Sequence, residues 1–227
     1  MPYSDKQRRL VAEIEQEYQY TAVYTGRSRP DPRVLRAMAT VPRHEFVPAV
    51  EQLFSYEDCP LPIGYGQTIS QPYIVALMTD LLDIEEGDTL LEIGTGSGYQ
   101  AAVLATIAKE VFTVEIVEPL AVAASQRLQR LGYANVTVRH GDGYQGWPDK
   151  GPFAGIILTA AALDVPPPLI AQLAPGGRMV LPIGPPAGRQ QLIVLSKSSD
   201  GSIDRRTVLD VAFVPLTGAH GVYSLSE

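Results

Sequence analysis

Apolar residues recur at helical spacing in the first part of the chain. Residues 4–19 carry Leu10 and Ile14 at positions that share one side of a helix. A second helix is predicted to begin at Asp31-Pro32, since an aspartate followed by a proline is typical of an N-cap and a first helical residue. The pattern therefore predicts a helical N-terminal region.

Beyond residue 86 short apolar runs alternate with helical segments. That alternation is typical of βαβ units, in which parallel strands share one sheet. No segment of helical length separates the last two strands, so we expect an antiparallel pair there. The predicted strands are Thr89–Ile93, Val111–Ile116, Val136–Arg139, Gly155–Thr159, Arg178–Pro182, Gln191–Leu195 and Val208–Val214, with helices from Tyr99 and from Pro119.

These elements predict an α/β fold with a mostly parallel sheet, a C-terminal antiparallel strand pair and an N-terminal helical extension. A length of 227 residues suits one core of this kind with a modest extension. Residues 1–85 are expected to form the helical extension and a segment that covers the substrate. Residues 86–227 are expected to form the cofactor-binding domain and the C-terminal strands.

Composition and charge narrow the possible functions. The net charge of -7, from 25 acidic and 18 basic residues, argues against the broad basic surface of a sequence-independent nucleic-acid binder. The single cysteine excludes an internal disulfide, and no metal-binding spacing occurs, so we expect no metal. The N-terminus lacks a signal-peptide pattern, and no apolar run approaches the roughly 18 residues of a membrane span. We therefore expect a cytoplasmic protein, and a monomer.

An apolar strand runs into a glycine-rich turn at Gly94–Gly98. Glycines let the backbone turn sharply and approach a ligand closely, and the helix that follows presents unpaired N–H groups. Glu115 closes the next strand about twenty residues further on, where an acid accepts hydrogen bonds from ribose hydroxyls. The spacing G-x-G-x-G, in place of the dinucleotide pattern G-x-G-x-x-G, favours S-adenosylmethionine over NAD. A turn that serves packing alone is the alternative.

Two further segments have a local and a functional interpretation. Asp142, after the third strand, is placed to accept a hydrogen bond from an adenine amino group, but Asp142-Gly143 is also an ordinary turn. Ser70 lies just before a predicted amphipathic helix with a proline in its first turn, which is typical of an N-cap. Gln67 and Thr68 have no such local role.

Three segments, Gly66–Pro72, Glu92–Gln100 and Arg139–Tyr144, occur together and in this order. In this combination the chain resembles the protein-L-isoaspartate O-methyltransferase family. Shorter matches, among them Val41-Pro42-Arg43 and Phe213–Leu216, extend the resemblance from roughly residue 31 to residue 218. It therefore covers most of the chain.

The resemblance implies a Rossmann-like, doubly wound domain that binds S-adenosyl-L-methionine. It implies methyl transfer to the α-carboxylate of L-isoaspartyl residues in damaged proteins, the first step of their repair. Ser70 is implied as the active-site residue, with Thr68 beside it. The expected cofactor contacts are Gln67, Ile69, Glu92, Gly94, Thr95, Gly96, Ser97, Gly98, Glu115, Ile116, Asp142, Gly143 and Thr159.

Two positions depart from the family pattern. Ala154 stands where the family usually has an aspartate, and Ala212 stands where a basic residue commonly precedes the phenylalanine. The second departure concerns peptide binding. It leaves open a specialised relative that methylates aspartate in one dedicated peptide.

Two other functions are compatible with the cofactor loop. A nucleic-acid methyltransferase would share it, but amino-methylating enzymes commonly carry an Asn/Asp-Pro-Pro-aromatic tetrad after the fourth strand, where this chain has Thr159-Ala160-Ala161-Ala162. A non-catalytic domain that binds the cofactor is the other alternative. Turnover of an isoaspartyl peptide separates both from the predicted enzyme.

Overall fold

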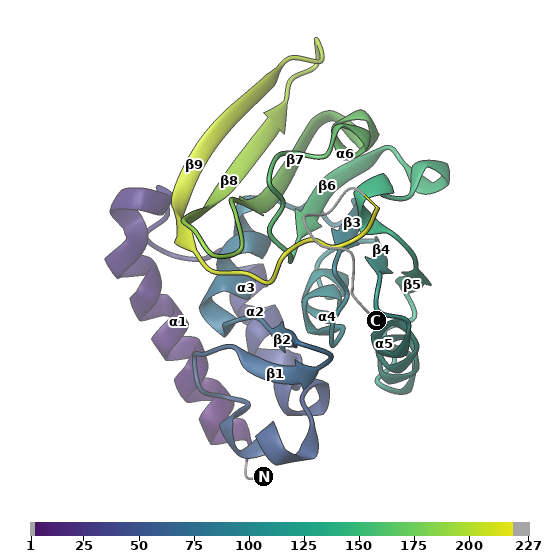
Figure 1. The fold of residues 1–227 in the computed structure, drawn as a ribbon. Coiled ribbons are helices and arrows are strands. Elements are labelled where there is room, and N and C mark those ends of the chain that lie inside the picture. Colours follow the sequence, from purple (N-terminus) through teal and green to yellow (C-terminus); the bar gives the residue numbers. More distant parts are fainter. Residues whose placement is uncertain (1–2, 220–227) are drawn as a thin grey trace.

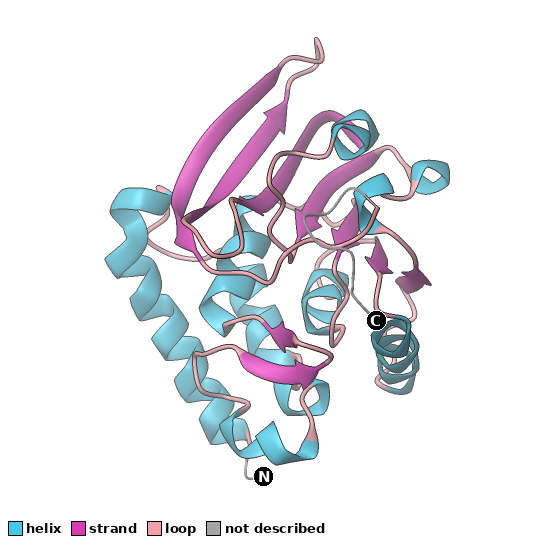
Figure 2. Ribbon diagram, viewed as in Figure 1, coloured by secondary structure: helices cyan, strands magenta, loops and turns pink. Residues whose placement is uncertain are grey.

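A seven-stranded sheet with helices on both faces organises the chain (Figures 1 and 2). The computed structural model describes residues 3–219, so the outer ends of the two expected regions, 1–2 and 220–227, lie outside the described residues. The strand order is β5-β4-β3-β6-β7-β8-β9. The strands are β3 (Thr89–Ile93), β4 (Glu110–Glu115), β5 (Val136–His140), β6 (Phe153–Leu158), β7 (Leu173–Ile183), β8 (Gln190–Lys197) and β9 (Ile203–Val211).

The sheet is doubly wound, as the sequence predicts. The chain starts in the middle at β3, moves outward through β4 to β5, and returns to the other side of β3 with β6. Strands β3 to β7 pair in parallel, whereas β7 with β8 and β8 with β9 are antiparallel. The predicted mostly parallel sheet with a C-terminal antiparallel pair is therefore confirmed.

Helices cover the two faces unequally. The N-terminal helices pack on the same face as α3, α4 and α5, and Leu10 and Ile14 of α1 belong to one buried cluster with Leu90 and Val180 of the sheet. The opposite face carries α6 and two short 3-10 helices over a second cluster. The helices are α1 (Ser4–Thr25), α2 (Pro32–Thr40), η1 (Arg43–Phe46), η2 (Ala49–Phe54), α3 (Pro72–Leu81), α4 (Tyr99–Ala105), α5 (Glu118–Arg130), η3 (Gly143–Gln145), η4 (Pro148–Lys150) and α6 (Pro167–Gln172).

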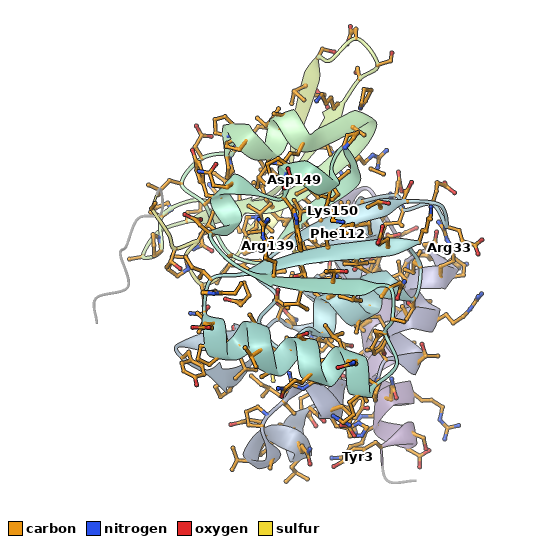
Figure 3. The ribbon with its side chains drawn as sticks, turned by 90° about the vertical axis from the view of Figure 1, so that its right-hand side faces the viewer. Tyr3, Arg33, Phe112, Arg139, Asp149 and Lys150 are labelled. Atoms are coloured by element: carbon orange, nitrogen blue, oxygen red, sulfur yellow. The ribbon has the colours of Figure 1, made fainter. Side chains whose placement is uncertain are left out.

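Cation–π contacts cover the sheet beside its outer strand β5. The guanidinium of Arg139 lies 4.3 Å from the ring centre of Trp147, and the ammonium of Lys150 lies 5.2 Å from that of Phe112. Figure 3 shows Arg139, Lys150 and Phe112 near one another on this side of the molecule. Trp147 also packs edge-on against Phe112, at 5.2 Å between ring centres. This indole therefore anchors the packing of this side of the sheet.

The last strand differs from the prediction at both ends. Strand β9 starts at Ile203 and ends at Val211, whereas the sequence predicts Val208–Val214. Residues 203–207 are exposed and, apart from Ile203, polar, so they do not show the alternating apolar pattern of a strand. Its predicted end leaves the sheet because Phe213 N–H donates to the side chain of Gln190 and Val214 C=O accepts from Ala161 N–H. We call residues 212–219, which cross the strand ends of the sheet, the C-terminal strap (Figure 1).

A small hairpin that the sequence does not predict presents the segment before α3. Strands β1 (Leu61–Gly64) and β2 (Gln67–Ile69) pair antiparallel around a turn at Tyr65-Gly66. Both turn residues have positive φ, 55° and 70°, which is typical of a tight hairpin turn. The hairpin leaves Thr68 exposed and buries Ile69.

Helix α3 is capped from a distant loop and not by Ser70. The helix starts at Pro72, and its N-cap Gln71 makes no side-chain cap hydrogen bond. The Asp58 carboxylate accepts from the Tyr73 N–H at 2.8 Å and from the Gln71 side-chain amide at 2.8 Å. The interpretation of Ser70 as an N-cap is therefore wrong, because Asp58 already satisfies the first turn of the helix.

This capping arrangement makes a testable prediction. Asp58→Ala should lower the free energy of unfolding by about 0.5–2 kcal/mol, because it removes the acceptor of the first helical turn. Asp58→Asn keeps an acceptor and should recover most of that loss. Ser70→Ala should stay within about 0.5 kcal/mol of the wild type. Urea unfolding followed by circular dichroism measures all three, and a larger loss in Ser70→Ala than in Asp58→Ala would reinstate the serine cap.

Candidate functional site

Adjoining cavities lie where the strand ends of the sheet, the hairpin and the strap meet. The wide cavity, of about 420 Å³, has Ser70, Gln71, Ile74 and residues 210–214 in its wall. The strand-end cavity, of about 50 Å³, lies between the ends of β3 and β4 and the strap. A narrow hollow along the glycine loop adjoins both. Thr68 and Thr159 line all three, so these two residues mark where the cavities meet.

The glycine loop begins at a point where no side chain fits. Gly94 has φ +94°, and a Cβ built on it would lie 2.4 Å from Oγ1 of Thr159. That hydroxyl donates to the Gly94 carbonyl at 2.6 Å, which fixes the two strand ends to each other. The loop therefore needs glycine at Gly94 for both conformation and space. Gly96 has φ +51° and more room, with Ile63 3.4 Å from its Cβ position.

Glu115 fastens the loop to the end of β4. One carboxylate oxygen accepts from the Gly96 N–H at 2.7 Å and the other from the Val117 N–H at 2.9 Å. The side chain also lines the strand-end cavity. A carboxylate can accept about four hydrogen bonds, so Glu115 keeps acceptor capacity for ligand hydroxyls.

The rest of the loop serves the start of α4. Thr95 shares a 2.6 Å hydrogen bond with Thr113 in the buried layer below it. Ser97 accepts from the Tyr99 N–H at 3.3 Å. Gly98 is the left-handed N-cap of α4, and its Cβ position lies 3.2 Å from Leu128. Gly98 therefore serves helix packing more than cavity shape.

Glu92 is a carboxyl group buried beneath the loop. It is fully shielded from solvent in β3, opposite Thr113 of β4, and neither of its oxygens meets a hydrogen-bond partner within residues 3–219. Burial raises the pKa of Glu92 to about 8, and the negative charge of Glu115 adds to this. At neutral pH this carboxyl is largely protonated.

Asp142 is occupied by protein groups in this structure. Its carboxylate accepts from Tyr144 N–H at 2.9 Å, which caps η3, and from Ala219 N–H of the strap at 3.0 Å. The neighbouring Gly143 lines the strand-end cavity, and a Cβ there would lie 2.3 Å from Ile93. The volume of the strand-end cavity, about 50 Å³, is below the roughly 300–1,000 Å³ of typical ligand pockets. A ligand of cofactor size therefore needs more room than the strand-end cavity has in this structure.

The hydroxyls of the wide cavity have no structural task. Ser70 is half-buried and Thr68 exposed, and within residues 3–219 neither hydroxyl makes a hydrogen bond to the protein. The Ser70 backbone carbonyl accepts from Arg43 at 2.9 Å. No histidine or lysine belongs to the described wall, where Asp210 is the one ionisable residue, and it is paired with Arg189 at 3.0 Å. The described wall can therefore orient an acceptor with neutral donors but offers no histidine or lysine as a general base.

The structure brings most residues of the predicted site together. Ala212 lines the wide cavity, so this departure from the family pattern falls within the site, whereas Ala154 lies in β6 away from it. Three predicted residues, Glu92, Gly98 and Asp142, do not line any of these cavities. Those that do are Gln67, Thr68, Ile69, Ser70, Gly94, Thr95, Gly96, Ser97, Glu115, Ile116, Gly143 and Thr159.

Sequence reasoning misses the apolar walls of the site. Residues 214–217 of the strap line the strand-end cavity, and Pro60 and Ile74 line the wide one. The apolar run Phe213–Leu216 was predicted in part as strand, because apolar runs alone do not show which segment a chain will cover. The proline at Pro215 gives no signal against that prediction, because it lies just beyond the predicted end at Val214.

The doubly wound sheet and the glycine loop at the end of β3 define the class of protein, a Rossmann-like S-adenosylmethionine-dependent methyltransferase. The family model for protein-L-isoaspartate(D-aspartate) O-methyltransferase matches residues 21–221, and the chain belongs to this family. Protein-L-isoaspartate O-methyltransferase 2 of Syntrophobacter fumaroxidans is 56% identical over 219 residues, which cover 96% of this chain and 89% of the relative. The enzyme of the same name from a Polaromonas species is 56% identical over 92% of this chain and 99% of its own length.

Solved structures agree with this assignment. A protein-L-isoaspartate O-methyltransferase superposes with a TM-score of 0.83 at 28% identity, over 95% of this chain and 67% of its own. A second structure, from Plasmodium falciparum and described as a complex with S-adenosyl-L-homocysteine, shares the fold with a TM-score of 0.73 at 24% identity, over 90% of this chain and 97% of its own. The predicted fold class, family, transferase activity and cofactor, S-adenosyl-L-methionine, are thereby confirmed.

The described residues also fit this cofactor chemically. Glycines at Gly94 and Gly143 leave room where a side chain would clash, and Glu115 retains acceptor capacity at the end of β4. Within residues 3–219 we find no cluster of three or more histidine, cysteine, aspartate or glutamate side chains suited to a metal. No helix in the described part of the chain has the length and hydropathy to cross a bilayer.

The close contact at Gly94 predicts a loss of cofactor affinity. Gly94→Ala should weaken the binding of S-adenosylhomocysteine at least tenfold, about 1.4 kcal/mol, because its Cβ displaces either the loop or Thr159. Gly87→Ala is the matched control, since its Cβ would meet nothing within 4 Å and its φ is not positive. Isothermal titration calorimetry measures both, and equal affinities for wild type and a folded Gly94→Ala protein would contradict the prediction.

Glu92 predicts a pH-dependent stability difference. A glutamate in the unfolded chain ionises near its ordinary pKa of 4.5, whereas Glu92 in the folded protein stays protonated up to about pH 8. The folded wild type therefore loses stability as pH rises between these values, by up to about 1.4 kcal/mol per pH unit. Glu92→Gln does not titrate, so its stability relative to wild type should rise from pH 5 to pH 8. Urea unfolding across this range checks it, and a constant difference would refute the pKa shift.

Proposed function

We propose that this chain methylates L-isoaspartyl residues of damaged proteins in the wide cavity, with Ser70 and Thr68 positioning the acceptor α-carboxylate. One observation supports this most. Both hydroxyls lie where the wide cavity meets the hollow along the glycine loop, and neither makes a hydrogen bond to another group within residues 3–219. Because Asp58 caps α3, the Ser70 hydroxyl is not needed by the helix. Both hydroxyls are thus available as donors to a carboxylate.

The cofactor contacts follow the cavity walls. Bound S-adenosyl-L-methionine supplies a methyl group on a sulfonium that is already activated for transfer. Gly94 and Gly96 shape the loop, and Glu115 accepts hydrogen bonds from the hydroxyl groups of the ligand. Thr159 lies where the wide cavity meets the strand-end cavity. Gln67, Ile69, Thr95, Ser97, Ile116 and Gly143 complete the proposed contacts, with Glu92, Gly98 and Asp142 supporting them from behind.

No general base is required by this reaction. An isoaspartyl α-carboxylate has a reference pKa of about 4 and is ionised at neutral pH. The chain has to bring this nucleophile in line with the donor and exclude water, which positioning alone achieves. The strap serves the second task, because residues 214–217 cover the strand-end cavity. The lack of histidine and lysine in the described wall of the wide cavity agrees with this chemistry.

Residues 1–85 serve in this proposal as the substrate-covering region and residues 86–227 as the cofactor domain. We also propose that the protein is a cytoplasmic monomer. Its substrates are proteins and not nucleic acids, and the net charge of -7 supports this choice of substrate. Ala212 in the wall of the wide cavity favours the second candidate, a relative restricted to one dedicated peptide. A panel of unrelated isoaspartyl peptides separates the two, since a general repair enzyme methylates most of them.

The central test compares an isoaspartyl peptide with its normal aspartyl twin. We expect methylation of the isoaspartyl form alone, because displacement by one methylene misplaces the nucleophile. Ser70→Ala should lower kcat/KM at least tenfold, about 1.4 kcal/mol, with little change in S-adenosylhomocysteine affinity or stability. Tritium transfer from labelled S-adenosylmethionine measures turnover.

Substitution by Asp or Asn separates donation from size and capping. Ser70→Asp puts a negative charge beside the substrate carboxylate, and Ser70→Asn replaces the hydroxyl with a bulkier amide, so both should be slow. A stable and fully active Ser70→Asp protein would remove Ser70 from the mechanism. Equal methylation of the two peptide isomers would overturn the assignment of the acceptor.

A further inference from the structure

A fully buried arginine lies directly behind the Ser70 segment. Arg43 of η1 has no exposed surface. Its Nη2 donates to the Ser70 carbonyl at 2.9 Å and to the Cys59 carbonyl at 3.3 Å. One guanidinium therefore joins two segments of chain that meet at the hairpin, one before β1 and one after β2.

The same guanidinium reaches the cofactor side of the site. Its central carbon lies 4.9 Å from the ring centre of Tyr99, the first residue of α4 after the glycine loop. The Tyr99 ring is itself held edge-on by Phe46, at 5.5 Å between ring centres. Arg43 thus touches both the proposed acceptor segment and the helix that begins where the cofactor loop ends.

This arrangement is costly for stability. Within residues 3–219 no carboxylate forms an ion pair with Arg43, and its Nε and Nη1 have no hydrogen-bond partner. Burial lowers the pKa of Arg43, although an arginine stays charged at neutral pH. Buried charges can often be replaced by well-packed apolar residues with equal or better stability. A role in geometry explains the presence of this cation better than a role in folding.

We propose that Arg43 is a positioning residue for methyl transfer, which fixes the Ser70 peptide relative to the glycine loop and so directs the Ser70 hydroxyl into the wide cavity. The inference rests on the proposed role of Ser70. Asp58 holds the following residues, Gln71 and Tyr73, from the other side. Among the described residues, Arg43 is the one side chain that binds the Ser70 carbonyl. Its removal would leave the backbone at Ser70 without this anchor.

Arg43→Met tests this proposal, because methionine fills much of the space without donating a hydrogen bond. We expect kcat for an isoaspartyl peptide to fall about tenfold, while KM and the calorimetric affinity for S-adenosylhomocysteine change less than about twofold. Arg43→Lys keeps the charge and a donor but lacks the planar guanidinium that lies over the Tyr99 ring, so kcat should fall by a smaller factor. If the Arg43→Met protein does not fold, the Arg43→Lys protein serves as the test in its place.

A double-mutant cycle with Ser70→Ala tells positioning from general damage. If Arg43 acts through Ser70, adding Arg43→Met to Ser70→Ala should lower kcat less than about twofold further. Leu10→Ala is the control for destabilisation, because Leu10 is buried in the core cluster that also holds Phe46 and Tyr99 but belongs to α1. Its kcat should equal that of the wild type at a temperature where both are folded.

Each outcome decides a separate point. Multiplied losses in the double variant, with Ser70→Ala slow on its own, would overturn the role of Arg43 and leave that of Ser70 intact. A fully active Ser70→Ala protein would overturn the role of Ser70 and this inference with it. A loss of S-adenosylhomocysteine affinity in Arg43→Met as large as its loss of kcat would show that Arg43 supports the cofactor loop and not the serine.

Discussion

The close approach of two neighbouring strand ends is the constraint on which the site depends. Ile93 of β3 pairs with Leu158 of β6, so the next residues, Gly94 and Thr159, face each other. The Thr159 N–H continues the ladder to Ile93 at 2.9 Å, and its hydroxyl binds the Gly94 carbonyl. The chain can leave the sheet at this point only without a side chain. The cofactor loop is thus a consequence of sheet register as much as of ligand chemistry.

Other walls of the site are attached in the same manner, by hydrogen bonds to backbone groups far away in sequence. Asp58 and Arg43 hold the segment around Ser70, and the strap is held by paired bonds between residues 214–216 and Ala161. Each attachment leaves functional side chains unengaged. Hydroxyls that have no structural partner can be presented to a ligand without loss of stability, which is why such anchors suit a site built by positioning.

The sequence predicts those parts whose signal is local. Strands β3 to β6 and the loop at Gly94–Gly98 follow from apolar runs that end in glycine, and they occur as expected. The cap of α3 could not be predicted, because Ser70 has the right residue type while the acceptor of the Tyr73 N–H is Asp58, fifteen residues before Tyr73. The end of β9 was misplaced because the apolar residues of the strap pack over a cavity and not in the sheet. Apolar patterns report burial and not the partner that provides it.

The distribution of charge accounts for the neutral character of the wide cavity. An acceptor that is already ionised needs donors, and a buried cation in contact with it would stabilise the ground state as strongly as the transition state. The Ser70 and Thr68 hydroxyls carry no net charge, and the one acid of the described wall, Asp210, is paired with Arg189. Ala212 leaves that wall apolar where the family commonly has a basic residue nearby. In the proposed mechanism, orientation of the carboxylate depends on the two hydroxyls and on the backbone that holds them in place.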